Sequence, residues 1–274
     1  MSILLESSTL LESIDARGVA RVTFNRPERR NALDPALVAE TIGALRRLEA
    51  REDVRVVLLA GAGGSFCAGG DIESMKRMAA ESFEENERDA LLLSELMQTL
   101  DRLAKPTLAL VRGAVYGGGV GLVSCCDIVV AADTASFCLS EVKIGLTPSV
   151  IGPYVHRAIG PRQARRYFLT AEVITAIRAR EIGLAHEVAQ EQELDAVCAR
   201  IVDALLAAAP GALREAKESC FLFAQRVLDE ELSRETAQRI AGRRISQEGR
   251  EGFTAFLEKR PPAWRTDTKG RDVP

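Results

Sequence analysis

Residues 107–122, TLALVRGAVYGGGVGL, join an apolar run of strand length to a glycine-rich segment and the start of a second apolar run. Residues 54–71, VRVVLLAGAGGSFCAGGD, show the same order of an apolar run followed by clustered glycines. Continuous apolar runs of this length are typical of strands that are buried on both faces of a parallel sheet. Each glycine-rich segment directly precedes an expected helix. The two stretches therefore predict an α/β fold.

The remainder of the first 200 residues fits this prediction. Residues 10–24 are expected to form a hairpin that turns at Gly18. Asp34 and Pro35 mark the start of a helix, because Asp is a preferred N-cap and Pro is favoured at the first helical position. Residues 127–133, DIVVAAD, form a further apolar run of strand length. A strand thus alternates repeatedly with a helical segment.

The pattern changes near residue 191, where helical segments follow one another with little strand between them. Pro210 with Gly211 marks the first boundary between these segments, and Gly249 marks the last. The helices are expected at residues 191–208, 210–226, 229–247 and 248–259. We therefore expect an α/β catalytic body over residues 1–205 and a helical C-terminal region over residues 206–274.

The composition indicates an ordinary globular protein with a large core. The 274 residues are 47% hydrophobic and carry a net charge of −3, and the basic doublets are scattered among acids. This distribution makes nucleic acid an unexpected partner. No run approaches the about 18 apolar residues that a membrane span needs, and the acidic N-terminal stretch differs from a signal peptide. We expect a cytoplasmic protein that does not bind membranes.

The scarcity of histidine and the spacing of cysteine exclude several chemistries. The chain has two histidines, His156 and His186, so a three-histidine metal site is excluded. The six cysteines contain no CxxC pair or metal-ligand spacing and are interpreted as buried thiols. The GxSxG, HExxH and Walker motifs are also missing from the sequence. No metal site is expected.

The two glycine-rich segments suggest a shared purpose. Backbone N–H groups at the start of a helix are free to bind an anion, and glycine allows a ligand to approach the backbone closely. Two such segments after separate strands would each supply one N–H to the same oxygen, as in an oxyanion hole. The alternatives are close packing of helix on strand or a dinucleotide site. The GxGxxG pattern of a dinucleotide site fails, because its third glycine position is Leu122.

Eight motifs are spread along the chain. They are NRPERRNAL (25–33), FCAGGD (66–71), GAVYGGGVGL (113–122), CCDIVVAADTASF (125–137), SEVKIGLTP (140–148), AIGPRQARRYFLTAE (158–172), AREIGLAHEV (179–188) and EGFTAFLEKRPPAW (251–264). As a set they resemble the enoyl-CoA hydratase/isomerase family, or crotonase superfamily. The resemblance implies a spiral of ββα units and a helical C-terminal region that forms trimers, often paired into hexamers. It also implies acyl-CoA thioesters as substrates, without a separate cofactor.

The resemblance also implies roles for individual residues. The two oxyanion donors would be the N–H groups of Ala68 and Gly118, and residues 68–71 would line the path of the coenzyme. The candidate contacts to the coenzyme are Ala68, Gly69, Gly70, Asp71 and Arg29 or Arg30, together with Phe256 and Lys259 from a neighbouring subunit.

The acids differ from those of most hydratases of this family, which use two glutamates. This chain has Gly121 at the first position and Glu141 at the second. One carboxylate suffices for an isomerase, and it suffices for a hydratase if it takes a proton from water and then gives it to Cα. The apolar neighbours of Glu141 are expected to raise its pKa. Gly121 is expected to leave room at the substrate β-carbon.

The stretches GGGVGLVSCCD (117–127) and FCLSEVKIGLTPSVIGPYVHRAIG (137–160) resemble the branch that hydrates 3-methylglutaconyl-CoA in leucine breakdown. The enzyme for isohexenylglutaconyl-CoA in terpene breakdown is equally similar. Such substrates carry a distal carboxylate, for which the candidate cations are Lys143, His156 and Arg157, each otherwise a surface or packing residue. Tyr116 either lines the acyl pocket or is a core aromatic.

Other functions remain open at this point. The first alternative is an enoyl-CoA isomerase that uses Glu141 alone. The second is a dehydratase that acts on a 3-hydroxy-3-methylglutaryl thioester of a carrier protein. A structural or RNA-binding role is the alternative outside enzymes.

Overall fold

The computed structural model describes residues 2–6 and 9–265 and confirms the mixed α/β fold. A seven-stranded sheet has the order β1 (Ser2–Glu6), β2 (Leu10–Ile14), β3 (Val19–Phe24), β4 (Val56–Gly61), β6 (Thr107–Val111), β8 (Ile128–Ala132) and β11 (Glu187–Ala189). A four-stranded sheet has the order β10 (Ile174–Thr175), β9 (Ser136–Cys138), β7 (Ala114–Tyr116) and β5 (Ser65–Cys67). The helices are α1 (Pro35–Ala50), α2 (Ile72–Met78), α3 (Phe83–Asp101), α4 (Gly118–Cys125), α5 (Gly152–Thr170), α6 (Ala176–Glu181), α7 (Leu194–Ala207), α8 (Pro210–Phe223), α9 (Glu230–Ile245) and α10 (Gln247–Leu257).

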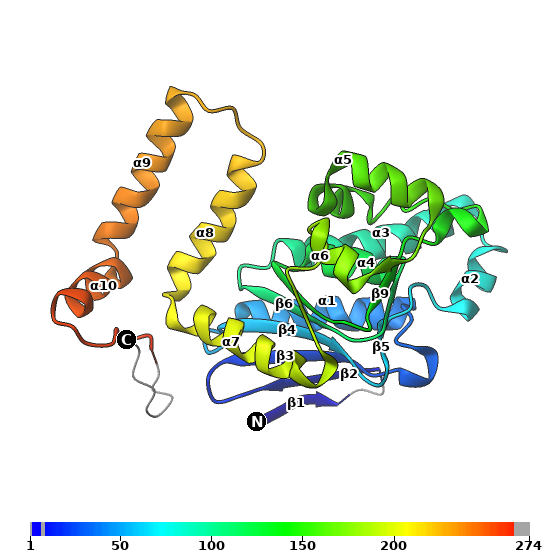
Figure 1. Ribbon diagram of the computed structural model, residues 1–274, viewed down its shortest axis with the longest axis horizontal. Helices are drawn as coiled ribbons and strands as arrows, with labels where there is room; N and C mark the ends of the chain where they lie inside the picture. The colour runs from blue at the N-terminus through cyan, green and yellow to red at the C-terminus, as the bar shows by residue number, and fades with distance from the viewer. Residues whose placement is uncertain (1, 7–8, 266–274) are drawn as a thin grey trace.

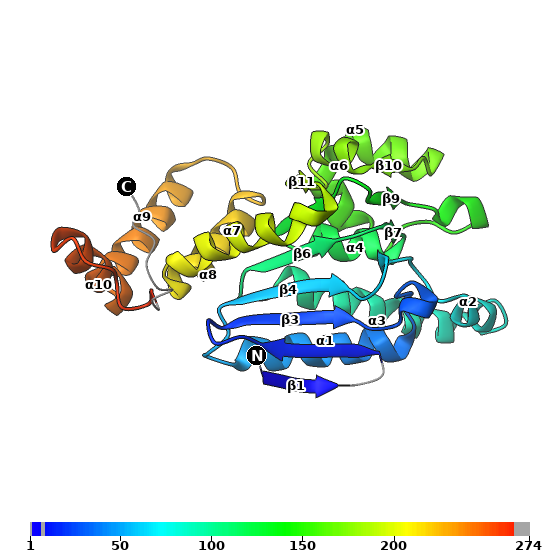
Figure 2. The same cartoon turned by 60° about the horizontal axis from the view of Figure 1, so that its bottom comes forward.

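The chain winds as a spiral in which each turn adds one strand to each sheet (Figure 2). Strands β4, β6 and β8 lie side by side and parallel in the large sheet. Their successors β5, β7 and β9 lie side by side and parallel in the small sheet. Helices follow each strand pair, with α2 and α3 after β5, α4 after β7, and α5 after β9. This arrangement is the expected spiral of ββα units.

Local sequence signals explain the first elements. The predicted hairpin forms from β2 and β3, which pair antiparallel. Helix α1 begins at Pro35, and the Asp34 carboxylate accepts a hydrogen bond from the Leu37 N–H at 2.8 Å, as an N-cap does. The apolar run at residues 107–111 forms β6, all of whose residues are buried.

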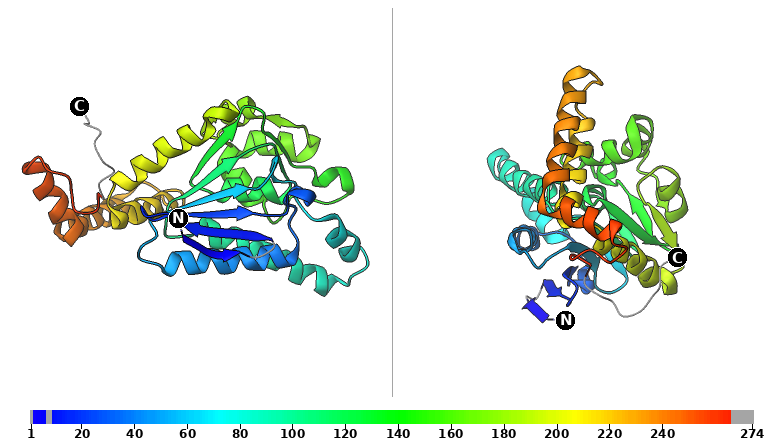
Figure 3. Two further views of the ribbon diagram at one scale, coloured as in Figure 1. Left: turned by 90° about the horizontal axis from the view of Figure 1, so that it is seen from below. Right: turned by 90° about the vertical axis from the view of Figure 1, so that its left-hand side faces the viewer.

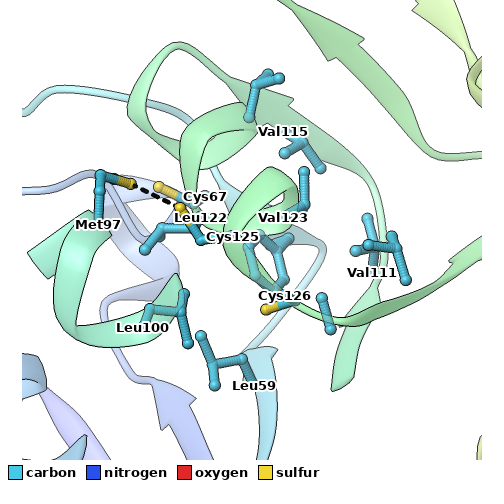
Figure 4. Packing of buried hydrophobic residues seen from close by; sticks show 14 of the residues in the cluster. Leu59, Cys67, Met97, Leu100, Val111, Val115, Leu122, Val123, Cys125 and Cys126 are labelled. Atoms are coloured by element: carbon cyan, nitrogen blue, oxygen red, sulfur yellow. Dashed lines mark hydrogen bonds between the residues drawn. The ribbon is translucent and has the colours of Figure 1, made fainter. Parts of the chain in front are cut away.

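Helix α4 runs through the middle of the core (Figure 4). Its Leu122, Val123 and Cys125 are buried, and the Cys125 sulfur lies 3.8 Å from that of Met97 on α3. A Cβ on Gly119 would come within 2.6 Å of the Cys67 carbonyl oxygen of β5, so only glycine permits this close approach. The N-terminus of α4 therefore packs directly against β5 of the small sheet.

Five of the six cysteines are buried, as expected, but Cys220 on α8 is exposed and corrects that prediction. Burial raises the pKa of the Cys67 thiol to about 12. The buried thiols therefore stay protonated and act as apolar packing groups.

Of the C-terminal helices, α7 covers the body, and the other three form a separate group. Helix α7 packs against the large sheet through Leu194, Cys198 and Val202. Helices α8, α9 and α10 project away from the body as an arm (Figures 1 and 3). Large apolar side chains exposed on this arm and its connecting turn are Phe223, Val227, Leu228, Ile240, Ile245, Phe253, Phe256 and Leu257. The sequence division at residues 205 and 206 stays a prediction, and residues 266–274 lie outside the described chain.

The last boundary in the arm differs from the one expected. Ser246 is the N-cap of α10, and its side chain accepts a hydrogen bond from the Gly249 N–H. Gly249 lies within the first turn of α10, and a side chain there would clash with the Arg243 carbonyl. The glycine is thus needed for close packing at the junction of α9 and α10, and it does not mark a helix end.

Within residues 2–6 and 9–265, no single helix is long and apolar enough to cross a membrane. Helices α7 and α8 meet the length and composition criteria only as a pair, and they are bent by 105°.

Candidate active site

The two glycine-rich loops meet at the end of the small sheet. A Cβ on Gly69 would lie 3.1 Å from the Tyr116 carbonyl oxygen and 3.8 Å from the Gly117 Cα. Gly69 and Gly117 have φ values of 94° and 48°, which glycine adopts without strain. The structure therefore confirms that strands distant in the sequence bring both loops to one place.

The Gly118 N–H is available to a ligand. Gly118 is the first residue of α4, where an N–H has no partner within the helix. It makes no hydrogen bond to any of the residues described, whereas the preceding Gly117 N–H donates to the Cys138 carbonyl at 2.9 Å. Gly118 therefore fits the predicted role of an oxyanion donor at the positive end of a helix.

The structure changes the assignment of the second oxyanion donor. The Ala68 N–H donates to the Arg30 carbonyl at 3.0 Å and is already satisfied. Gly70 is the centre of a short parallel bridge, in which the Gly69 carbonyl and the Asp71 N–H both bond to Leu33. The Gly70 N–H consequently points away from Leu33, and it has no hydrogen-bond partner in the described chain. Gly70 replaces Ala68 as the candidate donor.

Glu141 lies beside these donors, at the start of a 3₁₀ turn, Glu141–Ile144. Its Oε1 would be 3.3 Å from a Cβ on Gly117, the residue just before Gly118. Its Oε2 is buried and has no hydrogen-bond partner in the part of the chain described. Burial raises the pKa of this carboxyl above its ordinary value of 4.5, as predicted. A carboxyl with these properties suits proton transfer near neutral pH.

The space beside Gly121 is filled by protein. A Cβ at this position would lie 2.8 Å from the Ile151 Cβ and 3.1 Å from the Met97 sulfur. Ile151 is itself only 2% exposed. The expectation that Gly121 leaves room for a branched substrate is therefore wrong, because Ile151 occupies the space that a side chain at position 121 would take.

The candidate cations differ in availability. Lys143 is exposed on the same 3₁₀ turn as Glu141 and forms no salt bridge within the described chain. His156 is exposed on α5. Arg157 forms an ion pair with Asp101, and its guanidinium lies 5.3 Å from the ring centre of Phe221 on α8. Arg157 therefore holds the arm against the body. Because it is already paired with Asp101, it is not a cation available to the substrate carboxylate.

The residues proposed to contact the coenzyme lie in different parts of the structure. Asp71 is 3% exposed and is held by Arg26 and Arg29, so it belongs to the support of the loop. The side chains of Arg29 and Arg30 are exposed near the loop. Phe256 lies in the last turn of α10, and Lys259 follows the end of that helix. Their contact with a coenzyme stays a prediction.

Tyr116 precedes the glycines and is half-buried, and its carbonyl touches Gly69. A role in lining the acyl pocket stays a prediction. The described residues contain no group of three or more potential metal ligands.

His186 has a structural role. The Val129 N–H of β8 donates to its Nδ1 at 3.0 Å, and burial lowers its pKa below the ordinary 6.5. The unfolded chain therefore binds a proton at a higher pH than the folded one, so stability is lost as the pH falls below 6.5.

We expect a His186→Gln variant to lose less stability than the wild type between pH 7 and pH 5, as measured by thermal unfolding at several pH values. His156→Gln is the control, because His156 is exposed. An unchanged pH dependence in the His186 variant would contradict the assignment.

Comparison with known proteins gives a consistent result. Residues 15–267 match the family described as enoyl-CoA hydratase/isomerase. The chain is 34% identical to the crotonyl-CoA hydratase of Syntrophomonas wolfei and 34% identical to the short-chain-enoyl-CoA hydratase of Clostridium acetobutylicum, each time over 88% of this chain and 92% of the relative. The crystal structure of an enoyl-CoA hydratase of Shewanella pealeana has a TM-score of 0.90, with 42% identity over 93% of this chain and 96% of that one.

Proposed function

Because this chain belongs to the enoyl-CoA hydratase/isomerase family, we propose that it hydrates a branched enoyl-CoA of the 3-methylglutaconyl type with Glu141 as both base and acid. The hydratases among its relatives support enoyl-CoA hydratase activity in general. One observation carries the mechanism: the Glu141 carboxyl, whose Oε2 is buried without a partner among the described residues, packs against Gly117, the residue just before the unpaired Gly118 N–H. The coenzyme A thioester is the substrate, and no further cofactor belongs to the proposal.

The reaction needs two proton transfers. Glu141 takes a proton from water as the water oxygen bonds to the β-carbon, and the electron pair of the double bond moves onto the thioester oxygen. The N–H groups of Gly118 and Gly70 stabilise the resulting enolate. Glu141 then returns its proton to the α-carbon as the thioester carbonyl re-forms. A single carboxyl performs both transfers because they occur in sequence.

The branched, dicarboxylic substrate is supported by the sequence around the site. The stretches at residues 117–127 and 137–160 resemble the methylglutaconyl-CoA hydratase branch. Glutaconyl substrates carry a distal carboxylate that a cation would bind. Lys143 is the exposed cation on the turn that begins with Glu141. We therefore assign the distal carboxylate to Lys143.

We expect Lys143→Gln to raise KM for 3-methylglutaconyl-CoA by about tenfold or more, because a hydrogen bond to a charged group contributes about 1.5–3 kcal/mol. The KM for crotonyl-CoA, which lacks the second carboxylate, should stay unchanged. His156→Gln is the matched control. An equal loss with both substrates, or a selective loss in the His156 variant, would contradict the assignment.

The lone carboxyl also fits an enoyl-CoA isomerase, which is the second candidate function. Mass spectrometry of products from 3-methylglutaconyl-CoA, crotonyl-CoA and a 3-enoyl-CoA separates the two. We expect a gain of water with the glutaconyl substrate. Migration of the double bond in the 3-enoyl-CoA without any gain of water would favour the isomerase. A carrier-protein dehydratase would require the thioester of the carrier in place of that of coenzyme A.

The proposed enzyme is a cytoplasmic homotrimer or a dimer of such trimers. The large apolar side chains exposed on α8, α9 and α10 support association through the arm, since large apolar areas exposed on a soluble chain mark sites of interaction with other proteins. Light scattering on the purified protein measures the assembly. A monomer at micromolar concentration would overturn this proposal.

A further inference from the structure

The orientation of the Gly70 peptide depends on a short bridge between two segments. The Leu33 N–H donates to the Gly69 carbonyl at 2.7 Å, and the Asp71 N–H donates to the Leu33 carbonyl at 2.8 Å. These two bonds turn the Gly70 N–H away from Leu33. Whatever fixes residues 32–33 against residues 69–71 therefore also fixes the candidate donor.

Arg26 is the side chain that joins the two segments. One guanidinium nitrogen donates to the Ala32 carbonyl at 2.7 Å, and the other donates to the Asp71 carboxylate at 3.0 Å. Arg26 and Asp71 are 8% and 3% exposed. Asp34 also pairs with the Arg26 guanidinium at 3.0 Å. The buried guanidinium thus joins Ala32 to Asp71 across the bridge.

Asp71 extends this link to α2. Its second oxygen accepts hydrogen bonds from the Glu73 and Ser74 N–H groups at 2.9 and 3.3 Å, which makes it the N-cap of the helix. Burial alone would raise the pKa of this carboxyl, but its bonds to these N–H groups and to Arg26 lower it, so it stays ionised. The same carboxylate therefore ties the start of α2, directly after Gly70, to Arg26.

Asn31 fixes the other end of Arg26. Its side-chain oxygen accepts a hydrogen bond from the Arg26 N–H at 2.8 Å, and its amide donates to the Ala62 and Ser65 carbonyls at 2.9 and 2.7 Å. Its φ of 56° lies in the left-handed region, which asparagine adopts more readily than most residues other than glycine. This network binds residues 26–33 to the segment that enters β5 and to the Gly70 loop that follows β5.

We propose that the buried Arg26–Asp71 ion pair is a positioning device that aims the Gly70 N–H at the thioester oxygen. The proposal rests on the proposed function, because it requires that oxygen to be held by backbone donors. Neither side chain needs to touch the substrate, since both act through the Gly70 peptide. Oxyanion donors are effective because they are fixed before the reaction begins. A misplacement of about 1 Å can cost about 10²-fold in rate.

The test uses two variants. Asp71→Asn keeps an oxygen for the cap of α2 but loses the ion pair, and Arg26→Lys keeps the charge but loses the forked contact to Ala32 and Asp71. We expect kcat to fall about tenfold to hundredfold in Asp71→Asn, with KM changed less than threefold, and less in Arg26→Lys. Infrared spectra of bound butyryl-CoA, labelled with carbon-13 at the thioester carbon, report the donors directly. The carbonyl stretch should move back toward its value in free butyryl-CoA.

Glu12→Gln is the matched control, because Glu12 is 2% exposed and forms an ion pair with Arg47 at 2.9 Å on the β2 side of the body. It removes a buried carboxylate of the same kind without touching either glycine loop. We expect an unshifted carbonyl band relative to the wild-type complex. An Asp71→Asn variant that keeps the wild-type band, or an equal change in the Glu12 variant, overturns the positioning role. A wild-type complex without any carbonyl shift would instead overturn the proposed function.

Discussion

We expect the Glu141→Gln variant to lose about 10²–10⁴-fold in kcat, because general acid–base catalysis by one side chain contributes about this much. The loss should lie at the upper end of this range, since the other carboxyl next to a donor, that of Asp71, is engaged by Arg26 and by the N-terminal N–H groups of α2. Steady-state kinetics with 3-methylglutaconyl-CoA measure it. Glu141→Asp, which keeps the carboxyl, is the control and should retain more activity than the glutamine variant.

The Glu141→Gln substitution, which lowers activity, should raise stability relative to wild type as the pH rises. Burial raises the pKa of Glu141 above 4.5, so the folded protein binds a proton that the unfolded chain has released. The contribution of Glu141 to stability is therefore present below pH 4.5 and is lost as the pH rises through the folded-state pKa. We expect the difference in unfolding temperature, variant minus wild type, to increase from pH 4.5 toward pH 8. A constant difference would mean that the burial of this carboxylate has no energetic consequence.

The second large effect is expected for Gly118→Pro, which removes one backbone N–H from the site. Loss of an oxyanion donor typically costs about 10²–10³-fold in kcat. The helix should tolerate the change, since Gly118 is the first residue of α4 and proline is favoured there. Gly117 has φ 48° and ψ −117°, the mirror image of the extended conformation that precedes proline.

Gly118→Ala is the matched control, because it keeps the N–H. Its Cβ would lie 2.9 Å from the Leu33 Cδ1, and this end of a flexible side chain can move aside. Circular dichroism should show both variants folded. Equal activity of the proline and alanine variants would exclude the Gly118 N–H as a donor.

Sequence periodicity predicts the elements of this fold well because burial determines the pattern of residues. The run at residues 107–111 is apolar throughout, since β6 is covered on both faces. Asp34 and Pro35 mark the start of α1 through chemistry that is local to the chain. Gly249 indicates the junction of α9 and α10 to within three residues, because the close approach to the Arg243 carbonyl at this junction requires a glycine.

The candidate site is predictable from the sequence only in part. The glycine loops and Glu141 are recognisable from the sequence, since each depends on residue type and spacing. Whether Ala68 or Gly70 is the oxyanion donor depends on which N–H group bonds to the Arg30 carbonyl. This contact cannot be predicted from the spacing of residues in the sequence. Likewise, the residue that fills the space at Gly121 is Ile151, thirty positions further along the chain. Long-range packing therefore decides which donor is free and whether a second acid fits.

We propose that one carboxyl, Glu141, adds water to a branched enoyl-CoA. The most direct measurement is mass spectrometry of the product formed from 3-methylglutaconyl-CoA in water labelled with oxygen-18, by wild type and by Glu141→Gln side by side. We expect the wild-type product to gain one labelled water at the β-carbon and the variant product to form at a rate lower by about 10²-fold or more. Labelled product at the wild-type rate in the variant, or no label with the wild type, would contradict it.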